Sequence, residues 1–142
     1  MRIFFLILGL LFFTSCLEAI FLPKGKRIKM ITTGYCPCKK CCGWKRNWFG
    51  RPVYAHGKSK GKPKMVGICA DGTRAKKGTL AADPNYYEFG TKFYIPGYGF
   101  GTVHDKGGEI VGPNRLDLFF SSHNQALAWG VREKTVILIE GD

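Results

Sequence analysis

Short runs of strand-forming residues, separated by Gly, Pro or Asn, occupy most of the second half of this 142-residue chain. Two further runs of the same kind, 27–35 and 65–69, precede them. Short runs bounded by turn residues at fairly regular spacing predict a mainly β fold of the small-barrel or sandwich type. The strands expected in the second half are residues 79–82, 92–95, 101–105, 116–120 and 136–140.

One short helix is expected near the C-terminus, between the last two of these strands. Ser122 and Gln125 have the spacing of a capping box, in which both side chains accept hydrogen bonds from free backbone N–H groups at the helix start. Residues 126–129 are mostly good helix formers, and Gly130 is a natural left-handed terminator. We therefore predict about two and a half helical turns after residue 122.

Residues 1–22 have the composition of an export leader. A basic residue precedes an apolar run, 3–13, which has signal-peptide length and is too short for a membrane span. Cys16 ends a short sequence that resembles a lipoprotein processing box, so we expect it to carry a lipid. Cleavage after Ala19 and an uncleaved anchor are the alternatives. Each version predicts a chain exported to the cell envelope, periplasmic or membrane-anchored, with residues 23–142 as one domain.

Charge is divided unevenly along the chain. Residues 24–77 contain sixteen Lys and Arg against one acid, Asp71, whereas residues 78–142 contain five basic and eight acidic residues. Such asymmetry indicates a polyanionic partner. In an exported chain, an anionic envelope polymer or a membrane surface fits better than nucleic acid. A solvated surface is the alternative, and we expect residues 57–64 to form a flexible basic loop.

Four cysteines lie within seven residues, at the start of a basic, loop-rich segment that spans about 36–64: Cys36, Cys38, Cys41 and Cys42. In an oxidising compartment disulfides are the first expectation, although adjacent cysteines do not readily pair with each other. A thiolate metal site, in which Cys69 replaces one of the four, and free thiols are the alternatives. No His or carboxylate lies within the cluster, so we interpret it as a staple for the loop.

Three aspartates stand in short apolar or glycine-rich frames. Asp83 precedes a proline and Asp105 precedes Lys-Gly-Gly, so turn formation is an alternative reading of both. Asp117 lies between two leucines in an expected strand and has no turn residue beside it. A strand side chain that points to water is its alternative. Because an acid among apolar residues is unfavourable unless it is paired or used, Asp117 is the strongest candidate for chemistry.

These aspartates lie in a longer pattern. Residues 78–84, 89–99 and 104–120 resemble the 3D domain, a family named for its three aspartates, and the match extends over roughly 28–140. The family is similar to the catalytic core of MltA-type lytic transglycosylases. The resemblance implies a small six-stranded double-psi β-barrel with one short helix near the C-terminus.

The resemblance also implies an activity, namely non-hydrolytic cleavage of the bond between N-acetylmuramic acid and N-acetylglucosamine in peptidoglycan, with a 1,6-anhydro product. The family's catalytic aspartate falls on Asp117, and Asp105 and Asp83 shape the site. One carboxyl then donates and later recovers a proton, which requires a pKa above the ordinary value of ~3.9. Burial, or the charge of Asp105, would raise it. A non-catalytic glycan-binding module and a glycan hydrolase are the alternatives.

Substrate contacts are expected from four residues: Thr73, Tyr98, Gly107 and Gly108. His104, beside Asp105, is a possible second titrating group, whereas His123 is interpreted only as a helix-start residue. The expected partners are peptidoglycan glycan strands and, through the leader, the membrane. We expect a monomer with no cofactor, no catalytic metal and no nucleic-acid partner.

Overall fold

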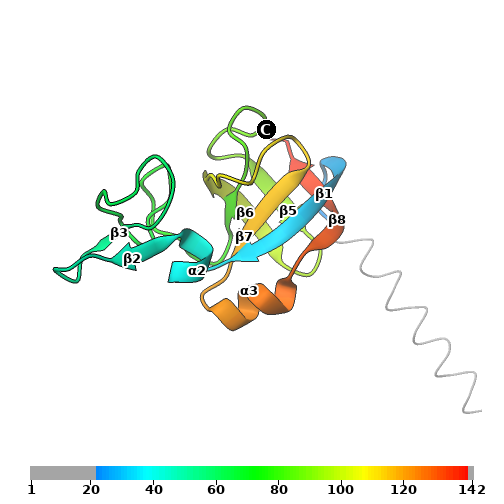
Figure 1. Cartoon of the computed structure of the whole chain (residues 1–142). Coiled ribbons are helices and arrows are strands. Elements are labelled where there is room, and N and C mark those ends of the chain that lie inside the picture. The colour runs from blue at the N-terminus through cyan, green and yellow to red at the C-terminus, as the bar shows by residue number, and fades with distance from the viewer. Residues whose placement is uncertain (1–21, 141–142) are drawn as a thin grey trace, which may run out of the picture.

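The computed structural model describes residues 22–140, and six strands of this part form a closed barrel (Figure 1). The order around the barrel is β1-β7-β4-β6-β5-β8, and β8 pairs with β1 to close it. The predicted mainly β fold, with a six-stranded barrel and one short helix near the C-terminus, is confirmed. The barrel strands are β1 (Lys26–Tyr35), β4 (Thr79–Ala81), β5 (Lys92–Ile95), β6 (Gly99–Asp105), β7 (Arg115–Phe119) and β8 (Arg132–Ile139).

Two strand pairs in the barrel are parallel, β1 with β7 and β4 with β6, and the other four pairs are antiparallel. Parallel neighbours need long connections, because a two-residue hairpin reverses the chain. The connection from β1 to β7 contains the barrel strands β4, β5 and β6, and the connection from β4 to β6 contains β5. The strands that carry the three aspartate motifs are therefore neighbours, in the order β7-β4-β6.

The barrel interior is filled by aliphatic and aromatic side chains. Leu116 and Leu118 on β7 are fully buried and point inward, as do Met30 on β1 and Phe93 on β5. Because side chains alternate across a strand, the inward leucines direct Asp117 to the outer face of the barrel. The other fully buried apolar residues of this cluster are Leu80, Ala82, Ile95, Val103 and Val136.

Helix α3 (His123–Trp129) covers one end of the barrel. Its N-cap is Ser122, whose hydroxyl accepts a hydrogen bond from the backbone N–H of Gln125, as predicted. The other half of the expected capping box is wrong, since the Gln125 side chain accepts from the Ser121 hydroxyl instead. At the end of the helix, Trp129 is buried and its Nε1 donates to Thr32 Oγ1 inside the barrel. This bond ties α3 to β1.

Gly34 on β1 lets α3 approach the barrel closely. A Cβ at this position would lie 2.8 Å from the carbonyl oxygen of Ala126 and 3.0 Å from the Phe120 ring. We expect Gly34→Ala to lower the free energy of unfolding by about 1–3 kcal/mol, because backbone cannot move as easily as a side chain. Gly108→Ala is the control, since a Cβ there meets nothing within 4 Å. Chemical denaturation measures both, and equal free energies of unfolding for the two variants would contradict this packing.

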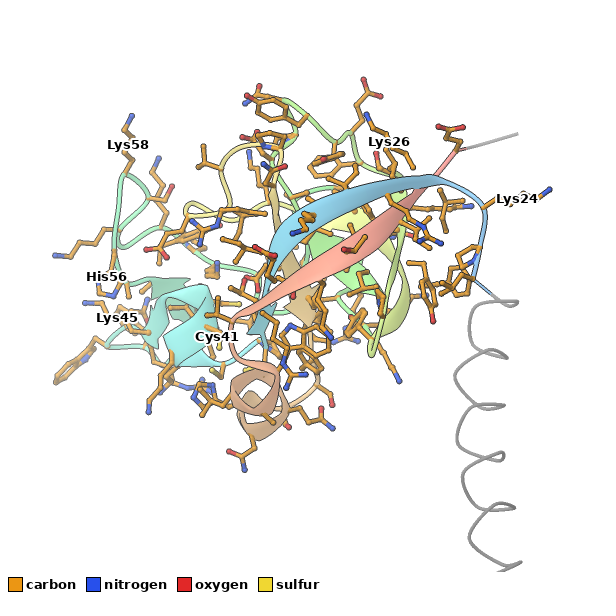
Figure 2. All side chains as sticks on the ribbon, turned by 90° about the vertical axis from the view of Figure 1, so that its right-hand side faces the viewer. Lys24, Lys26, Cys41, Lys45, His56 and Lys58 are labelled. Carbon is orange, nitrogen blue, oxygen red and sulfur yellow. The ribbon has the colours of Figure 1, made fainter. Side chains whose placement is uncertain are left out.

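The segment 36–64, here called the basic lobe, contains more regular structure than the sequence indicated. It begins with the short helix α2 (Lys39–Cys42) and continues in an antiparallel pair, β2 (Trp44–Arg46) and β3 (Pro52–Tyr54). The lobe projects from one side of the barrel (Figure 1). Figure 2 shows Lys45, His56 and Lys58 in its outer part and Cys41 where α2 meets the barrel.

The strand expected at 65–69 is wrong, because this stretch forms only an isolated bridge between Ile68 and Arg74. The leader predicted at 1–22, with Cys16, lies outside the described residues except for Leu22. Within residues 22–140, no helix has the length and apolar character needed to cross a membrane.

Candidate carboxylate site on the barrel surface

A row of four residues crosses the outer face of the barrel from β1 to β6. The strand registers pair Thr33 with Asp117, Asp117 with Ala81, and Ala81 with Asp105. Residues paired across neighbouring strands point to the same face of a sheet. Asp117 and Asp105 therefore stand on the same face, separated by one strand whose residue in the row carries only a methyl group.

A register irregularity brings Asp105 into this row. On β4 and β6, Leu80 pairs with Val103, but the next residue, Ala81, pairs with Asp105 and not with His104. A bulge of this kind inserts one extra residue and reverses the direction of the side chains that follow. Without it, His104 would occupy the place of Asp105, and the Asp105 carboxylate would point toward the core.

Asp117 is half-buried. Its carboxylate accepts a hydrogen bond of 2.7 Å from the Thr33 hydroxyl. Burial, with a smaller contribution from the negative charge of Asp105, raises the pKa of Asp117 to about 6, against the opposing effects of Thr33 and Arg115. A carboxyl with such a pKa is protonated in a substantial fraction of molecules near pH 6, as a general acid must be.

Asp105 is held by three donors. Its Oδ1 accepts from the backbone N–H groups of Ala70 (3.1 Å) and Lys106 (2.9 Å), and its Oδ2 accepts from the Tyr35 hydroxyl (3.2 Å). Tyr35 comes from β1, so its ring reaches over β7 and β4 and packs with Ala81 and Phe119. This apolar cluster forms the floor of the site, that is, the barrel surface between Asp117 and Asp105.

Sequence reasoning missed two residues of this site, Thr33 and Tyr35. Both lie at the end of a strand that was expected from its alternation, and both stand on the outer face, opposite the inward Thr32. The available signal was that alternation, which predicts a common face for residues 33 and 35. The alternation did not show which strand lies beside this face of β1.

Asp83 has a different environment, in which both carboxylate oxygens accept hydrogen bonds from Gly112 and Asn85. Its Oδ2 accepts from the backbone N–H of Gly112, and its Oδ1 accepts from both the backbone N–H and the side-chain amide of Asn85. These bonds, the one from Gly112 first, lower the pKa of Asp83. The carboxylate thus joins the end of β4 to the loop before β7, and it stands outside the Thr33-to-Asp105 row.

Asp71, Thr73 and His104 form a separate group. Asp71 accepts two hydrogen bonds from Thr73, one from its backbone and one from its hydroxyl, and its other oxygen lies 2.6 Å from His104 Nδ1. Although burial alone would raise the pKa of Asp71, the bonds from Thr73 and His104 lower it. His104 therefore pairs with Asp71, and the hydroxyl of Thr73, an expected substrate contact, is engaged in this turn.

The other expected substrate contacts lie in different surroundings. The Tyr98 hydroxyl donates to the Phe119 carbonyl and accepts from the backbone N–H of Gly78, so its polar end joins strands. A Cβ at Gly107 would meet Ile110 at 2.7 Å, whereas Gly108 faces open space. Tyr98 lines a pocket beside α3 that none of the three family aspartates lines; its walls include Lys77, Phe120, Gln125, Trp129 and Arg132.

The five described cysteines are free thiols, so the disulfide expectation is not met among residues 22–140. Three of them converge with a histidine from α3: Cys36, Cys38, Cys41 and His123. Cys42, which was expected in the cluster, instead directs its Sγ to the Cys36 carbonyl oxygen. His123, interpreted as a helix-start residue only, takes its place. No His lies within the cysteine segment of the sequence, but the fold brings one to it from 82 residues further along the chain.

Residues 78–140 match the family model of the 3D domain, which includes all three aspartates and the strands β4 to β8. The chain therefore contains a 3D domain. It is also similar to two curated proteins of Bacillus subtilis (strain 168). One is described as "Cell wall-binding protein YocH", 39% identical over 76 residues, which are 51% of this chain and 26% of YocH. The other is the "Putative cell wall shaping protein YabE", 40% identical over 57 residues, or 40% of this chain and 13% of YabE. The matched parts thus span about a quarter of the first relative and an eighth of the second.

Proposed function

We propose that this protein acts on the cell wall, as a lytic transglycosylase that cleaves the glycan strands of peptidoglycan. The observation that carries the proposal is the half-buried Asp117, with a pKa of about 6, placed in one row with Asp105. The names of the two relatives, a cell wall-binding and a cell wall shaping protein, support a role in the cell envelope. The reaction itself is argued from the carboxylates.

Asp117 is assigned the role of general acid and base. It protonates the glycosidic oxygen as the bond breaks and positive charge develops on the sugar ring. The same carboxylate then takes the proton of the sugar's C6 hydroxyl, whose oxygen closes the 1,6-anhydro ring. No water is consumed, so a single carboxyl suffices for both transfers.

Asp105 is assigned an electrostatic role. Its two oxygens accept hydrogen bonds from Ala70, Lys106 and Tyr35, and these bonds orient the carboxylate. A fixed negative charge beside Asp117 favours the protonated form of Asp117 and stabilises the positive charge of the transition state. Asp83 supports the loop before β7 through its bonds to Gly112 and Asn85.

A non-catalytic glycan-binding module is the second candidate. It is favoured by the printed name of the first relative and by the basic lobe, which carries nine of the Lys and Arg between residues 36 and 64. A positively charged surface binds an anionic wall polymer without any chemistry at Asp117.

Incubation of the protein with purified peptidoglycan sacculi, followed by mass spectrometry of the soluble fraction, separates the candidates. A transglycosylase releases fragments with 1,6-anhydromuramyl ends, and a hydrolase releases reducing ends that are heavier by one water. A binding module releases neither and sediments with the sacculi. Sedimentation without any released fragment would refute the catalytic proposal.

Thr33 sets the position of the alkaline limb of the pH profile. Its hydroxyl bonds to the ionised form of Asp117 and so lowers that pKa. We expect Thr33→Val to raise the pKa of Asp117 and to move the alkaline limb of cleavage upward by about half to one pH unit. Thr33→Ser retains the hydroxyl and should retain the profile. A downward shift in the valine variant would contradict the assignment of Asp117 as the acid.

A further inference from the structure

Three cysteines of the basic lobe and one histidine of α3 point their ligand atoms at a common centre. Cys36 follows the last residue of β1, Cys38 is the N-cap of α2, and Cys41 lies within α2. His123 is the first residue of α3. The three Sγ atoms and a ring nitrogen of the histidine all lie within 4.8 Å of one another.

The spacing of these atoms is that of a tetrahedral metal site. Zn–S bonds of about 2.3 Å and Zn–N bonds of about 2.05 Å place sulfurs about 3.8 Å apart and sulfur about 3.5 Å from nitrogen. The Sγ atoms of Cys36 and Cys41 are 3.7 Å apart. His123 Nδ1 lies 3.5 Å from Cys38 Sγ, 3.5 Å from Cys41 Sγ and 3.9 Å from Cys36 Sγ.

The local backbone supports thiolates at this place. The backbone N–H of Cys41 donates to Cys38 Sγ at 3.4 Å, which stabilises negative charge on that sulfur. Lys39 and Lys40 lie between the two cysteines in the sequence, so the segment that carries the thiols is positively charged. Cys36 is buried, whereas Cys38, Cys41 and His123 are partly exposed, so an ion can reach the site from solvent.

We propose that Cys36, Cys38, Cys41 and His123 bind one Zn²⁺ ion. Three sulfurs and one imidazole are a ligand set typical of structural zinc sites, and four protein ligands leave no open position for a reacting water. A metal ion would use all four side chains. A disulfide between any two of the cysteines would leave the third thiol and the histidine without a partner.

The ion would join two segments that are far apart in the sequence. It would fix the start of the basic lobe to the N-terminal end of α3, and α3 is itself bound to β1 through Trp129 and Thr32. Cys41 and Cys42 pack against the cluster of Tyr35, Ala81 and Phe119, which is the floor between the two aspartates. The zinc site would therefore hold this apolar cluster, and with it the carboxylate site, in place without taking part in the reaction.

Metal analysis of the full chain tests this directly. The protein is produced with zinc in the medium, desalted and analysed by inductively coupled plasma mass spectrometry, and we expect one zinc ion per chain. Loss of a hydrogen bond that supports a metal ligand typically lowers affinity by roughly 10- to 100-fold. Because Cys38→Ser and His123→Asn each remove a ligand itself, the loss of zinc affinity should be larger. Cys42→Ser is the matched control, since its hydroxyl can still donate to the Cys36 carbonyl, and it should keep one zinc.

Cobalt substitution gives a second readout that does not depend on cleavage activity. Co²⁺-loaded wild type and Cys42→Ser should show a strong thiolate-to-cobalt charge-transfer absorption, and Cys38→Ser should weaken it. Three results would overturn the proposal: no zinc in the wild-type protein despite its supply; unchanged zinc affinity in both ligand variants; or a disulfide among Cys36, Cys38 and Cys41, detected by alkylation and mass spectrometry of protein purified without reductant.

Discussion

Replacing Asp117 by Asn is expected to abolish glycan cleavage while making the folded protein more stable at neutral pH. Asparagine has almost the same shape and can still accept the hydrogen bond from Thr33. It cannot donate a proton to the glycosidic oxygen, and removal of a general acid typically lowers rates by about 10²–10⁴-fold. Release of anhydromuramyl fragments at pH 5.5–6 is the measurement.

The stability change follows from the direction of the pKa shift. Because the pKa of Asp117 rises from 3.8 to about 6 on folding, the folded state favours the protonated carboxyl. This contribution is complete below about pH 4 and is lost as the pH rises through about 6. Above that pH an ionised carboxylate stays half-buried, at a cost of at most about 3 kcal/mol. The asparagine variant avoids this cost, so its melting temperature should exceed that of the wild type by more at pH 8 than at pH 4.5.

A surface acid provides the control for both measurements. Glu133 on β8 lies on a strand outside the carboxylate row and forms an exposed pair with Lys29. Such pairs contribute little, so Glu133→Gln should leave cleavage and melting temperature nearly unchanged. Full cleavage by the Asp117→Asn variant would remove Asp117 from its role. A fall in its melting temperature at pH 8 would show that the carboxyl is not in a dry place.

Replacing Asp105 by Asn is expected to cause the next largest loss, about 10²-fold in cleavage near neutral pH, because one electrostatic stabiliser of the transition state is removed. The amide can still accept from the backbone N–H groups of Ala70 and Lys106, so the local fold should persist. The negative charge of Asp105 raises the pKa of Asp117. Without it, the alkaline limb of the pH profile should move to lower pH, opposite to the shift expected for Thr33→Val.

This opposition distinguishes an electrostatic role from a structural one. A variant that only disturbs the fold would lose activity at every pH and would also lose melting temperature. Cosedimentation with sacculi should remain at the wild-type level in Asp105→Asn, since the basic lobe is unchanged. An unmoved alkaline limb, or one moved upward, would contradict the coupling between the two carboxyls.

Most strands of the barrel could be predicted from sequence because local patterns determine them. The alternation in 27–35 and the short apolar runs at 92–95 and 116–120 correspond to β1, β5 and β7 within a residue or two. The expected strand at 65–69 failed because an apolar run with a buried cysteine forms a strand only if a partner strand lies beside it. In the basic lobe the error was the opposite one, since strands are present where loops were expected. Its short strands β2 and β3 form a separate two-stranded sheet, and their sequences carry no alternation long enough to detect.

Some residues of the candidate site could likewise be predicted from the sequence, and others could not. Asp117 was found because an acid between two inward-facing leucines is unusual in itself. The position of Asp105 depends on a one-residue bulge beside Ala81, and bulges follow from pairing between strands distant in sequence. Tyr35 and Thr33 belong to the site only because β1 lies beside β7 in a closed barrel. His123 lies 82 residues from Cys41, so the spacing of the cysteines alone gave no reason to connect them.

The central claim is that Asp117 is held in surroundings dry enough to keep its proton near neutral pH. The most direct test follows the carboxyl ¹³C resonance of Asp117 by NMR between pH 3 and pH 9, with the signal assigned by its loss in Asp117→Asn. We predict a midpoint near 6, as burial and the Asp105 charge require, lower in Asp105→Asn and higher in Thr33→Val. A midpoint at or below about 4, the value of an ordinary solvated aspartate, would contradict the account.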